Sequence, residues 1–579
     1  MDDSELTAEQ PGILVPSRFG LWRVAGAIVL LGVLAAYLPA MSGGYIWTDA
    51  ANVRGKQEFG PWNELWRIWT ASDTEQYFPI TFTSFWLERQ IWGLQPVASH
   101  VINLSLHILN VFLFAQCLLR LKVPGAWFAA AIFALHPVHV ESVAWIIERK
   151  NVLSGAFFLA ALLSYIRFEQ GARASVYYCS LGLFVLALLS KSSTVFFPVV
   201  MILVRFYLGR TWSWRDVWRV APFVVLALIS VAITVSYDHA KNPFVERELR
   251  SGFGERLAVA GLSFWFYLVK LILPINLALV YEKWQIDPGS IESYAPALGA
   301  VVAVIALWLM RNRLGRGPLV AVLFFGAGIF PLLGFFSFYY LKIADVADHF
   351  QYLPSLGPIA LFAGIAGHWF AVLRRKAGQV FRGLYWGGAI GLLATLGILT
   401  WRQCRLYRDN YTIWSDTLKK SPKSWVVHGM FAKAVGSRGD VELARFHLRK
   451  EIQLRPKGAR AYVTLARLEL RLGRTKEAEA LCRAGIAAAP EFPSPYLLLA
   501  SIDGRTGRLS KAIMLYEKVL QLPVLRQPAV VHYRLAKALR KDGQMKKAEM
   551  HLRKALELDP RLRQIGRRGS DDERGKAGE

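Results

Sequence analysis

The feature that most constrains this chain is a series of long apolar segments within its first 401 residues. The first of them, residues 21–41, is long enough to cross the ~30 Å hydrocarbon layer of a bilayer as a helix. Backbone polar groups inside a bilayer must be paired within the segment, so these runs are expected to be helical. We predict eleven spans, near residues 21–41, 98–119, 125–138, 152–168, 176–190, 194–209, 219–236, 293–311, 318–336, 354–373 and 383–401.

Composition supports a membrane protein. The 579 residues are 54% hydrophobic and only 19% charged, which excludes a simple soluble enzyme. The four cysteines form no C-x-x-C pair, which excludes a disulfide scaffold and a thiolate metal site. The formal net charge of +27 suits an acidic partner or anionic lipid headgroups, or simply a solvated basic surface. We expect membrane lipid and protein as partners, and no nucleic acid.

The distribution of Lys and Arg among the loops predicts the orientation, because short basic loops stay in the cytoplasm. The basic loops are residues 120–122, 167–173, 205–219, 311–316 and 374–382. They alternate with loops that are acidic, mixed or rich in His, at 42–97, 139–151, 237–292 and 337–353. We therefore place the N-terminal segment 1–20 in the cytoplasm and the second set of loops outside.

Two features complicate this topology. If the apolar run 259–280 crossed the membrane, every later basic loop would lie on the outer side. We therefore interpret this run as re-entrant or interfacial. Three arginines that follow the last span, at 402, 405 and 408, favour a cytoplasmic C-terminal region. Long domains translocate largely regardless of charge, however, and an odd span count puts this region outside. We predict an integral protein of a bacterial plasma membrane with an extracytoplasmic C-terminal domain.

The C-terminal region contains an internal repeat. Three sets of small residues recur at spacings of 34, 34 and 36: Gly439, Gly473, Gly507 and Gly543; Ala432, Ala466, Ala500 and Ala536; and Ala444, Ala478, Ala512 and Ala548. This pattern resembles the tetratricopeptide repeat (TPR), in which small residues lie where two antiparallel helices touch. We predict a linker over 402–423, about four repeats over 424–560 forming an α-solenoid, and a disordered tail over 561–579. The concave groove of such a solenoid would bind an acceptor protein or peptide.

Polar residues gather at the predicted outer ends of several spans, where they are costly. Asp49 directly follows the first span, residues 136–151 (HPVHVESVAWIIERKN) join the third and fourth, and Lys191 interrupts the apolar run 176–204. A helix cap would explain Asp49, and snorkelling to the interface would explain Lys191. Their shared side of the membrane instead favours one functional site.

A metal site is one interpretation of His136, His139 and Glu141. The three-residue spacing with Pro137 in between argues against a regular helical pair of ligands. We therefore expect no metal.

Three motifs in this order, HPVHVESVAWIIERKNVLS, LLSKSSTV and ADHFQYLPSLG, precede the repeats. Over nearly its whole length the chain thus resembles the transmembrane-and-TPR-containing family of protein O-mannosyltransferases. The resemblance implies an all-α, polytopic bundle of the C-type glycosyltransferase fold, with a polyprenyl-phosphate sugar as donor and no certain cofactor. It also implies that an acidic residue of the first outer loop, here Asp49, is the catalytic base.

The chain departs from the family pattern at two positions. It has Thr48-Asp49 where two consecutive acids are usual, and His349 where arginine is usual. Histidine is only partly cationic near neutral pH, which weakens the case for binding the donor phosphate.

The remaining candidate residues have four expected roles. The secondary acids are Glu75 and Glu141. The donor-phosphate ligands are Arg149, Lys150, Lys191 and His349. The residues that line the site are His136, His139, Asp348 and Tyr352.

The sequence analysis favours an inverting glycosyltransferase that moves a sugar, mannose by the resemblance, from a polyprenyl phosphate to Ser or Thr hydroxyls of an extracytoplasmic protein. A single carboxylate suffices for such a displacement, whereas retaining hydrolysis needs a second as nucleophile. Two alternatives remain open: a catalytically inactive membrane-anchored TPR scaffold, and a transferase that acts on an envelope lipid or glycan.

Overall fold

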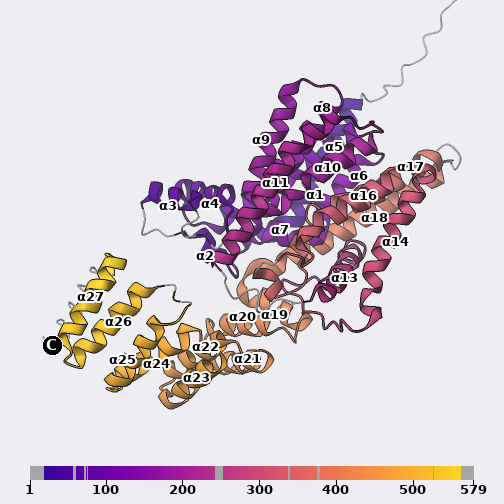
Figure 1. The fold of residues 1–579 in the computed structure, drawn as a ribbon. Helices are drawn as coiled ribbons and strands as arrows, with labels where there is room; N and C mark the ends of the chain where they lie inside the picture. Colours follow the sequence, from indigo (N-terminus) through magenta and orange to yellow (C-terminus); the bar gives the residue numbers. More distant parts are fainter. Residues whose placement is uncertain are drawn as a thin grey trace, which may run out of the picture. The chain divides into compact units, whose positions relative to one another are not determined.

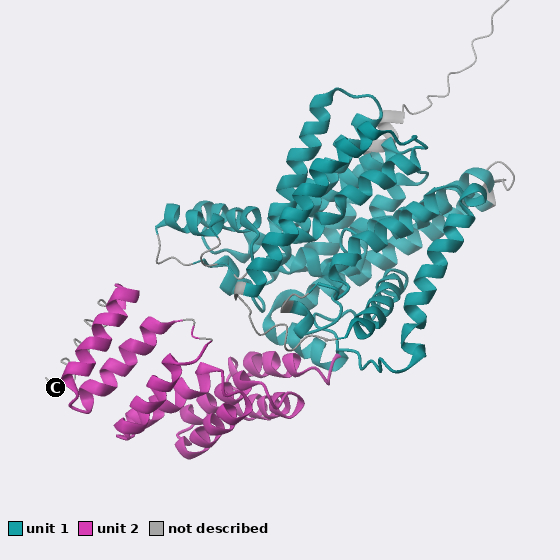
Figure 2. Ribbon diagram, in the orientation of Figure 1, with its two compact units in different colours: residues 1–420 teal, residues 421–579 magenta. Residues whose placement is uncertain are grey.

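The computed structural model describes residues 18–55, 60–70, 74, 76–241, 252–336, 339–373, 378–523, 525 and 527–562. Every regular element in this part of the chain is helical, which confirms the predicted all-α fold (Figure 1). The chain divides into two compact units, residues 1–420 and 421–579 (Figure 2). Residues 1–17 of the predicted N-terminal segment lie outside the described residues, and so do residues 563–579 of the predicted tail.

Unit 1 contains the apolar helices together with shorter and more polar ones. They are α1 (Arg18–Tyr37), α2 (Asp49–Val53), α3 (Pro61–Trp69), α4 (Pro79–Trp92), α5 (Pro96–Arg120), α6 (Ala126–Leu135), α7 (Val140–Ala144), α8 (Arg149–Glu169), α9 (Ala174–Ser190), α10 (Phe197–Tyr207), α11 (Trp214–Lys241), α13 (Phe253–Ile272), α14 (Ala295–Leu309), α15 (Arg311–Leu314), α16 (Gly317–Ile329), α17 (Leu356–Leu373), α18 (Gly378–Cys404) and α19 (Asn410–Lys420). Short 3-10 turns connect several of them, including η3 (Ile146–Glu148), η4 (Ser192–Phe196) and η8 (Asp348–Gln351).

The predicted count of eleven spans is not confirmed. Each predicted run contains helix, although 125–138 is interrupted at His136 and 318–336 leaves helix after Leu332, and in the described part of the chain seven helices are long and apolar enough to cross a membrane. An eighth crossing is possible if α6 and the segment Pro137–Ala144, which meet at a bend of 53°, form one span. Three further apolar helices are shorter: Ala174–Ser190, Ser192–Tyr207 and Gly317–Leu332.

A polar stripe on α5, formed by Asn103 and Asn110, bonds to backbone carbonyl groups between the end of α7 and the first turn of α8. The Asn103 amide donates to the carbonyl oxygens of Val143 (3.3 Å) and Ile146 (3.2 Å). The Asn110 amide donates to the Val152 carbonyl at 2.8 Å. A non-helical turn inside an apolar bundle is tolerated only when its polar groups are paired in this way. The polar stripe of α5 therefore fixes the turn that carries the candidate site.

Unit 2 consists of four helix pairs: α20 (Trp425–Gly436) with α21 (Val441–Leu454), α22 (Ala459–Arg471) with α23 (Thr475–Ala488), α24 (Pro493–Arg505) with α25 (Leu509–Leu520), and α26 (Pro528–Lys541) with α27 (Met545–Leu558). Repeated alanines such as Ala466, Ala478 and Ala500 are completely buried where helices touch. Gly473, in the turn of the second pair, has φ of 77°, a conformation that favours glycine. The predicted TPR solenoid is confirmed.

The segment predicted as a linker, residues 402–423, is mostly helical. It contains the end of α18, a 3-10 turn over Arg405–Arg408, and α19. The α19 helix is part of unit 1, and the boundary between the units falls after Lys420.

Candidate active site

Asp49 lies at the start of α2, in the loop that follows the first apolar helix. One carboxylate oxygen accepts the backbone N–H of Ile46 at 3.0 Å, and the other accepts the N–H of Ile147 at 2.8 Å. The second bond joins the loop to η3, which lies 98 residues further along the chain. The side chain is completely buried. The structure thus brings Asp49 to the turn that carries Glu148, Arg149 and Lys150.

Burial raises the pKa of Asp49 to about 7, because the charged form loses its hydration. The two backbone N–H bonds oppose this rise, Glu148 adds to it and Lys150 reduces it. A carboxylate with a pKa near the working pH is suited to act as a general base. The same burial and hydrogen bonds are also compatible with a purely structural carboxylate.

Stacked aromatic rings connect this loop to the motif that contains His349. The rings of Trp47 and Trp145 are parallel, with centroids 5.1 Å apart, and Trp414 packs edge-on against Trp47. On its other side, Trp145 lies 5.9 Å from the His349 ring. Sequence reasoning did not select Trp145, although it lies within the most family-specific motif.

Glu148 is the centre of the polar cluster. One carboxylate oxygen lies 2.7 Å from Lys150 Nζ and 4.0 Å from His349 Nε2. The other accepts the Asn151 amide at 2.7 Å and lies 3.7 Å from Lys191 Nζ. Lys191 also donates to the side-chain amide oxygen Oδ1 of Asn151. Lys150, Lys191 and His349, three of the predicted phosphate ligands, therefore surround the Glu148 carboxylate. The sequence analysis did not single out Glu148.

His349 is held by Glu141. Its Nδ1 lies 2.8 Å from one Glu141 oxygen, and its backbone N–H donates to the other at 3.2 Å. Burial lowers the pKa of His349 to about 3; Glu148 opposes this effect, and Lys191 and Lys150 strengthen it. The imidazole is accordingly neutral at physiological pH, and its Nδ1 shares a hydrogen bond with Glu141.

Asp348 accepts the Tyr281 hydroxyl, which lies 3.0 Å from both carboxylate oxygens. Burial raises the pKa of Asp348 to about 7, although the Tyr281 hydrogen bond and the charges of Lys270 and Lys420 lower it.

Arg149 points to a different set of partners. Its Nη2 lies 2.5 Å from Glu88, and its Nε donates to Asn103 at 2.9 Å. The guanidinium also lies over the Phe85 ring, 4.1 Å from its centre. Arg149 is completely buried, so its charge is already balanced inside the protein.

Three of the predicted lining residues form internal hydrogen bonds, and one of them, Tyr352, also lines the small cavity described below. His136 Nε2 bonds to the Leu271 carbonyl at 2.9 Å, and His139 bonds to Phe133 and Ser355 at 2.8 and 3.0 Å. The Tyr352 hydroxyl meets His107 at 2.8 Å. Within the described residues, no group of three or more His, Cys, Asp or Glu could hold a metal ion. The secondary acid Glu75 lies outside the described residues.

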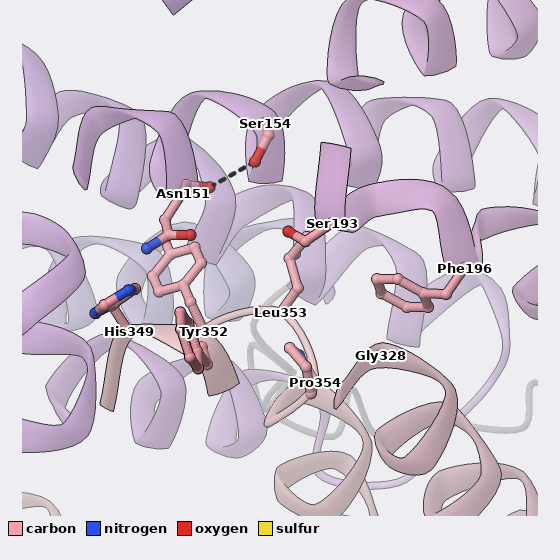
Figure 3. A pocket seen from close by; sticks show the side chains of 10 residues that line it. Asn151, Ser154, Ser193, Phe196, Gly328, His349, Tyr352, Leu353 and Pro354 are labelled. Carbon is pink, nitrogen blue, oxygen red and sulfur yellow. Dashed lines mark hydrogen bonds between the residues drawn. The ribbon is translucent and has the colours of Figure 1, made fainter. Parts of the chain in front are cut away.

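A small cavity lies beside the polar cluster (Figure 3). Its polar wall is formed by Asn151, Ser154, Ser193 and His349, and its apolar wall includes Phe196, Leu353 and Pro354. The cavity therefore joins the neighbourhood of Lys191, through Asn151, to an apolar surface. The cavity admits only about one water molecule, so a larger ligand would require the surrounding side chains to move.

Comparison with known proteins gives consistent results. Two family models described as tetratricopeptide repeat match residues 437–502 and 529–562. Human "Protein O-mannosyl-transferase TMTC3" is 21% identical over 92% of this chain and 64% of its own length. "Protein O-mannosyl-transferase F38B6.6" of Caenorhabditis elegans is 23% identical over 77% of this chain and 65% of its own length. The human TMTC2 transferase is 34% identical over 146 residues, 23% of this chain and 18% of its own.

Among solved structures, the crystal structure of MamA is 21% identical and covers 27% of this chain and 89% of its own, with a TM-score of 0.24. The chain spans only about 64% of the length of human TMTC3. Its apolar helices and its relatives identify it as an integral membrane protein. Over most of its length, this chain is a homologue of the TMTC-family protein O-mannosyl-transferases, and its C-terminal unit carries tetratricopeptide repeats.

Proposed function

We propose that this protein is a membrane O-mannosyltransferase that moves mannose from a polyprenyl phosphate to Ser or Thr hydroxyls of an extracytoplasmic protein. The observation that supports this most is the hydrogen bond from Ile147 N–H to Asp49. Ile147 directly precedes Glu148, which pairs with Lys150 and Lys191. The bond therefore holds a carboxylate with a pKa of about 7 next to this polar cluster.

In the proposed reaction, Asp49 takes the proton from the acceptor hydroxyl. Each of its oxygens accepts one backbone N–H and retains a lone pair for this purpose. The hydroxyl oxygen forms a bond to the anomeric carbon while the bond from that carbon to the phosphate oxygen breaks. The polyprenyl phosphate leaves with the bonding electrons, and this single displacement inverts the anomeric carbon. A positioned general base contributes about 10²–10⁴-fold in rate.

Lys150 and Lys191 are the proposed ligands of the donor phosphate. Without donor, both are balanced by Glu148, so the phosphate must take over at least one of these contacts. The polar wall of the neighbouring cavity offers the hydroxyls of Ser154 and Ser193 as additional donors. In this proposal the lipid phosphate is stabilised by ammonium groups and hydroxyls as it leaves.

Arg149 and His349 have supporting roles in this proposal. Arg149 is paired with Glu88, and we assign it to holding α8 against α4 rather than to the phosphate. His349 is neutral and bound to Glu141, so we assign it to orienting the cluster. The TPR unit recruits the acceptor, and both it and the site lie on the extracytoplasmic side.

The test is a comparison of purified wild type, Asp49→Asn and Asp287→Asn with polyprenyl-phosphate mannose as donor. Asp287 is exposed and accepts the Gly289 N–H, which an Asn can do as well, so it is a matched control. We expect Asp49→Asn to lose about 10²–10⁴-fold in transfer rate and Asp287→Asn to keep the wild-type rate. Equal rates for wild type and Asp49→Asn would remove Asp49 from its role.

A membrane-anchored TPR scaffold is the second candidate, and the burial of Asp49 between two backbone N–H groups favours it. A scaffold predicts no transfer by wild type with any polyprenyl-phosphate sugar, together with a lower unfolding temperature for Asp49→Asn. Transfer to a lipid or glycan but not to protein would support an envelope-directed transferase.

A further inference from the structure

The first helices of the four repeats in unit 2, namely α20, α22, α24 and α26, present an exposed surface that is basic throughout. They contain nine Lys and Arg residues, and all nine are exposed: Lys433, Arg460, Arg467, Arg471, Arg505, Arg534, Lys537, Arg540 and Lys541. Their only acidic residues are Glu469 and Asp503, and both are buried. We call the exposed surface of these four helices the first-helix face.

The two acids are occupied inside the solenoid. Glu469 accepts two bonds from Arg445 on α21, at 2.8 and 2.9 Å, and Asp503 accepts one from Arg508 at 2.6 Å. Arg445 and Arg508 lie outside the first helices, so these pairs do not reduce the positive charge of the first-helix face. The second helices differ, because they carry acids among their basic residues: Glu442, Glu451, Glu477, Glu479, Glu517, Glu549 and Glu557. The second helices also carry Lys and Arg, so what is segregated is the exposed acids: among these eight helices they lie only on the second helices, and the exposed charge of the first-helix face is positive throughout.

The repeat spacing aligns these cations. Lys433, Arg467 and Lys537 occupy one position of the repeat, and Arg471, Arg505 and Lys541 occupy another, four residues later. Positions four residues apart lie on the same side of a helix, so the two sets form adjacent rows. The first helices α22 and α24 also pack directly against each other, so the cations of these two repeats lie on neighbouring helices.

From this segregation we infer that the first-helix face binds an extended acidic polypeptide segment. Aligned rows of exposed cations with no exposed acid between them match the repeated carboxylates of such a segment. This inference concerns unit 2 alone and does not depend on a catalytic role for Asp49.

The test uses the full-length protein in detergent and a short, fluorescently labelled peptide of alternating Glu and Ser. Arg467→Glu/Arg471→Glu reverses two aligned cations on α22. The control Arg449→Glu/Lys476→Glu makes the same change in net charge at exposed positions on α21 and α23. We expect the first variant to weaken binding about tenfold, because each reversal replaces an attraction with a repulsion. The control should bind within about twofold of wild type, and salt should weaken binding by wild type.

Several outcomes would overturn the inference: equal weakening by both variants, equal binding of a Lys and Ser peptide, or binding of anionic vesicles but not of the acidic peptide. The neutral variant Arg467→Gln/Arg471→Gln serves as a check for misfolding, because it removes the two charges without adding repulsive ones. Its affinity for the acidic peptide should fall less than that of the charge-reversal variant. An unchanged affinity in that correctly folded variant would also refute the proposal.

Discussion

The buried pair formed by Arg149 and Glu88 allows a structural role to be separated from donor binding. The two side chains are 0% and 2% exposed, and their charged atoms lie 2.5 Å apart. We consider Glu88→Leu, Arg149→Met and the double variant. Each single change leaves one buried charge without its counter-ion, whereas the double change removes both charges.

The expected magnitudes follow from desolvation. Removal of one partner from a buried ion pair costs about 3–5 kcal/mol of unfolding free energy, because the remaining charge is uncompensated. For Glu88→Leu the loss should be at the lower end, since Asn103 and the Phe85 ring still contact the guanidinium. Replacement of the whole pair by apolar groups of similar volume is often neutral or stabilising. The double variant should thus be more stable than either single variant.

Unfolding free energies of the four proteins can be measured by reversible titration with SDS in mixed micelles, and transfer rates with saturating donor. We expect a coupling free energy of about 3 kcal/mol or more, and transfer by the double variant close to that of wild type. Loss of less than about 1 kcal/mol in both single variants would show that the pair is not desolvated. A stable but inactive double variant would refute the structural assignment and return Arg149 to the donor phosphate.

Three further outcomes are expected. Lys191→Met should raise the KM for donor about tenfold or more, as measured by initial rates, and an unchanged KM would remove Lys191 from the phosphate site. Transfer should fall as the pH drops below about 7, because protonated Asp49 cannot act as a base, and this acid limb should be missing from the residual activity of Asp49→Asn. Burial and His428 lower the pKa of His447 to about 4, below the ~6.5 of an unfolded histidine. Protons then bind the unfolded state first, so α20 and α21 should lose stability as the pH falls from about 6.5 towards 4. His428→Tyr/His447→Leu, which copies Tyr462 and Leu481 of the next repeat, should abolish this loss in hydrogen-exchange measurements corrected for intrinsic rates; persistence of the loss would contradict the assignment.

The solenoid could be predicted from sequence because its constraints are local and periodic. A small residue such as Ala466 or Ala478 is required wherever two helices touch, and the requirement returns with every repeat. The apolar runs of unit 1 likewise indicated helices, since composition alone decides what a bilayer accepts. Which of these helices cross could not be predicted by composition, because breaks such as that after α6 depend on partners elsewhere in the chain.

Those partners are the reason why the site was only partly predicted. Asn103 and Asn110 look like isolated polar residues within an apolar run, yet Asn103 bonds to the backbone of the turn that holds Glu148, and Asn110 bonds to the first turn of α8. The sequence analysis grouped Arg149 with Lys150 because they are adjacent. Their side chains diverge at the start of α8, one towards Glu88 and the other towards Glu148. Adjacent residues on a helix point in directions about 100° apart, and no motif specifies which one meets a counter-ion.

The charge balance of the cluster has a consequence for donor binding in the proposed reaction. Lys150 and Lys191 are buried or nearly so, and Glu148 compensates both. A phosphate that takes over the two ammonium groups leaves Glu148 uncompensated, and a buried unpaired carboxylate is costly. The Glu148 carboxylate can then take up a proton itself, and His349, whose Nε2 lies 4.0 Å from Glu148, is another acceptor beside it. Donor binding should therefore take up about one proton, measurable by calorimetry in buffers of different ionisation enthalpy, and Glu148→Gln should abolish the uptake. Donor binding without proton uptake in wild type would show that Glu148 keeps its ion pairs with Lys150 and Lys191, and that the phosphate binds elsewhere.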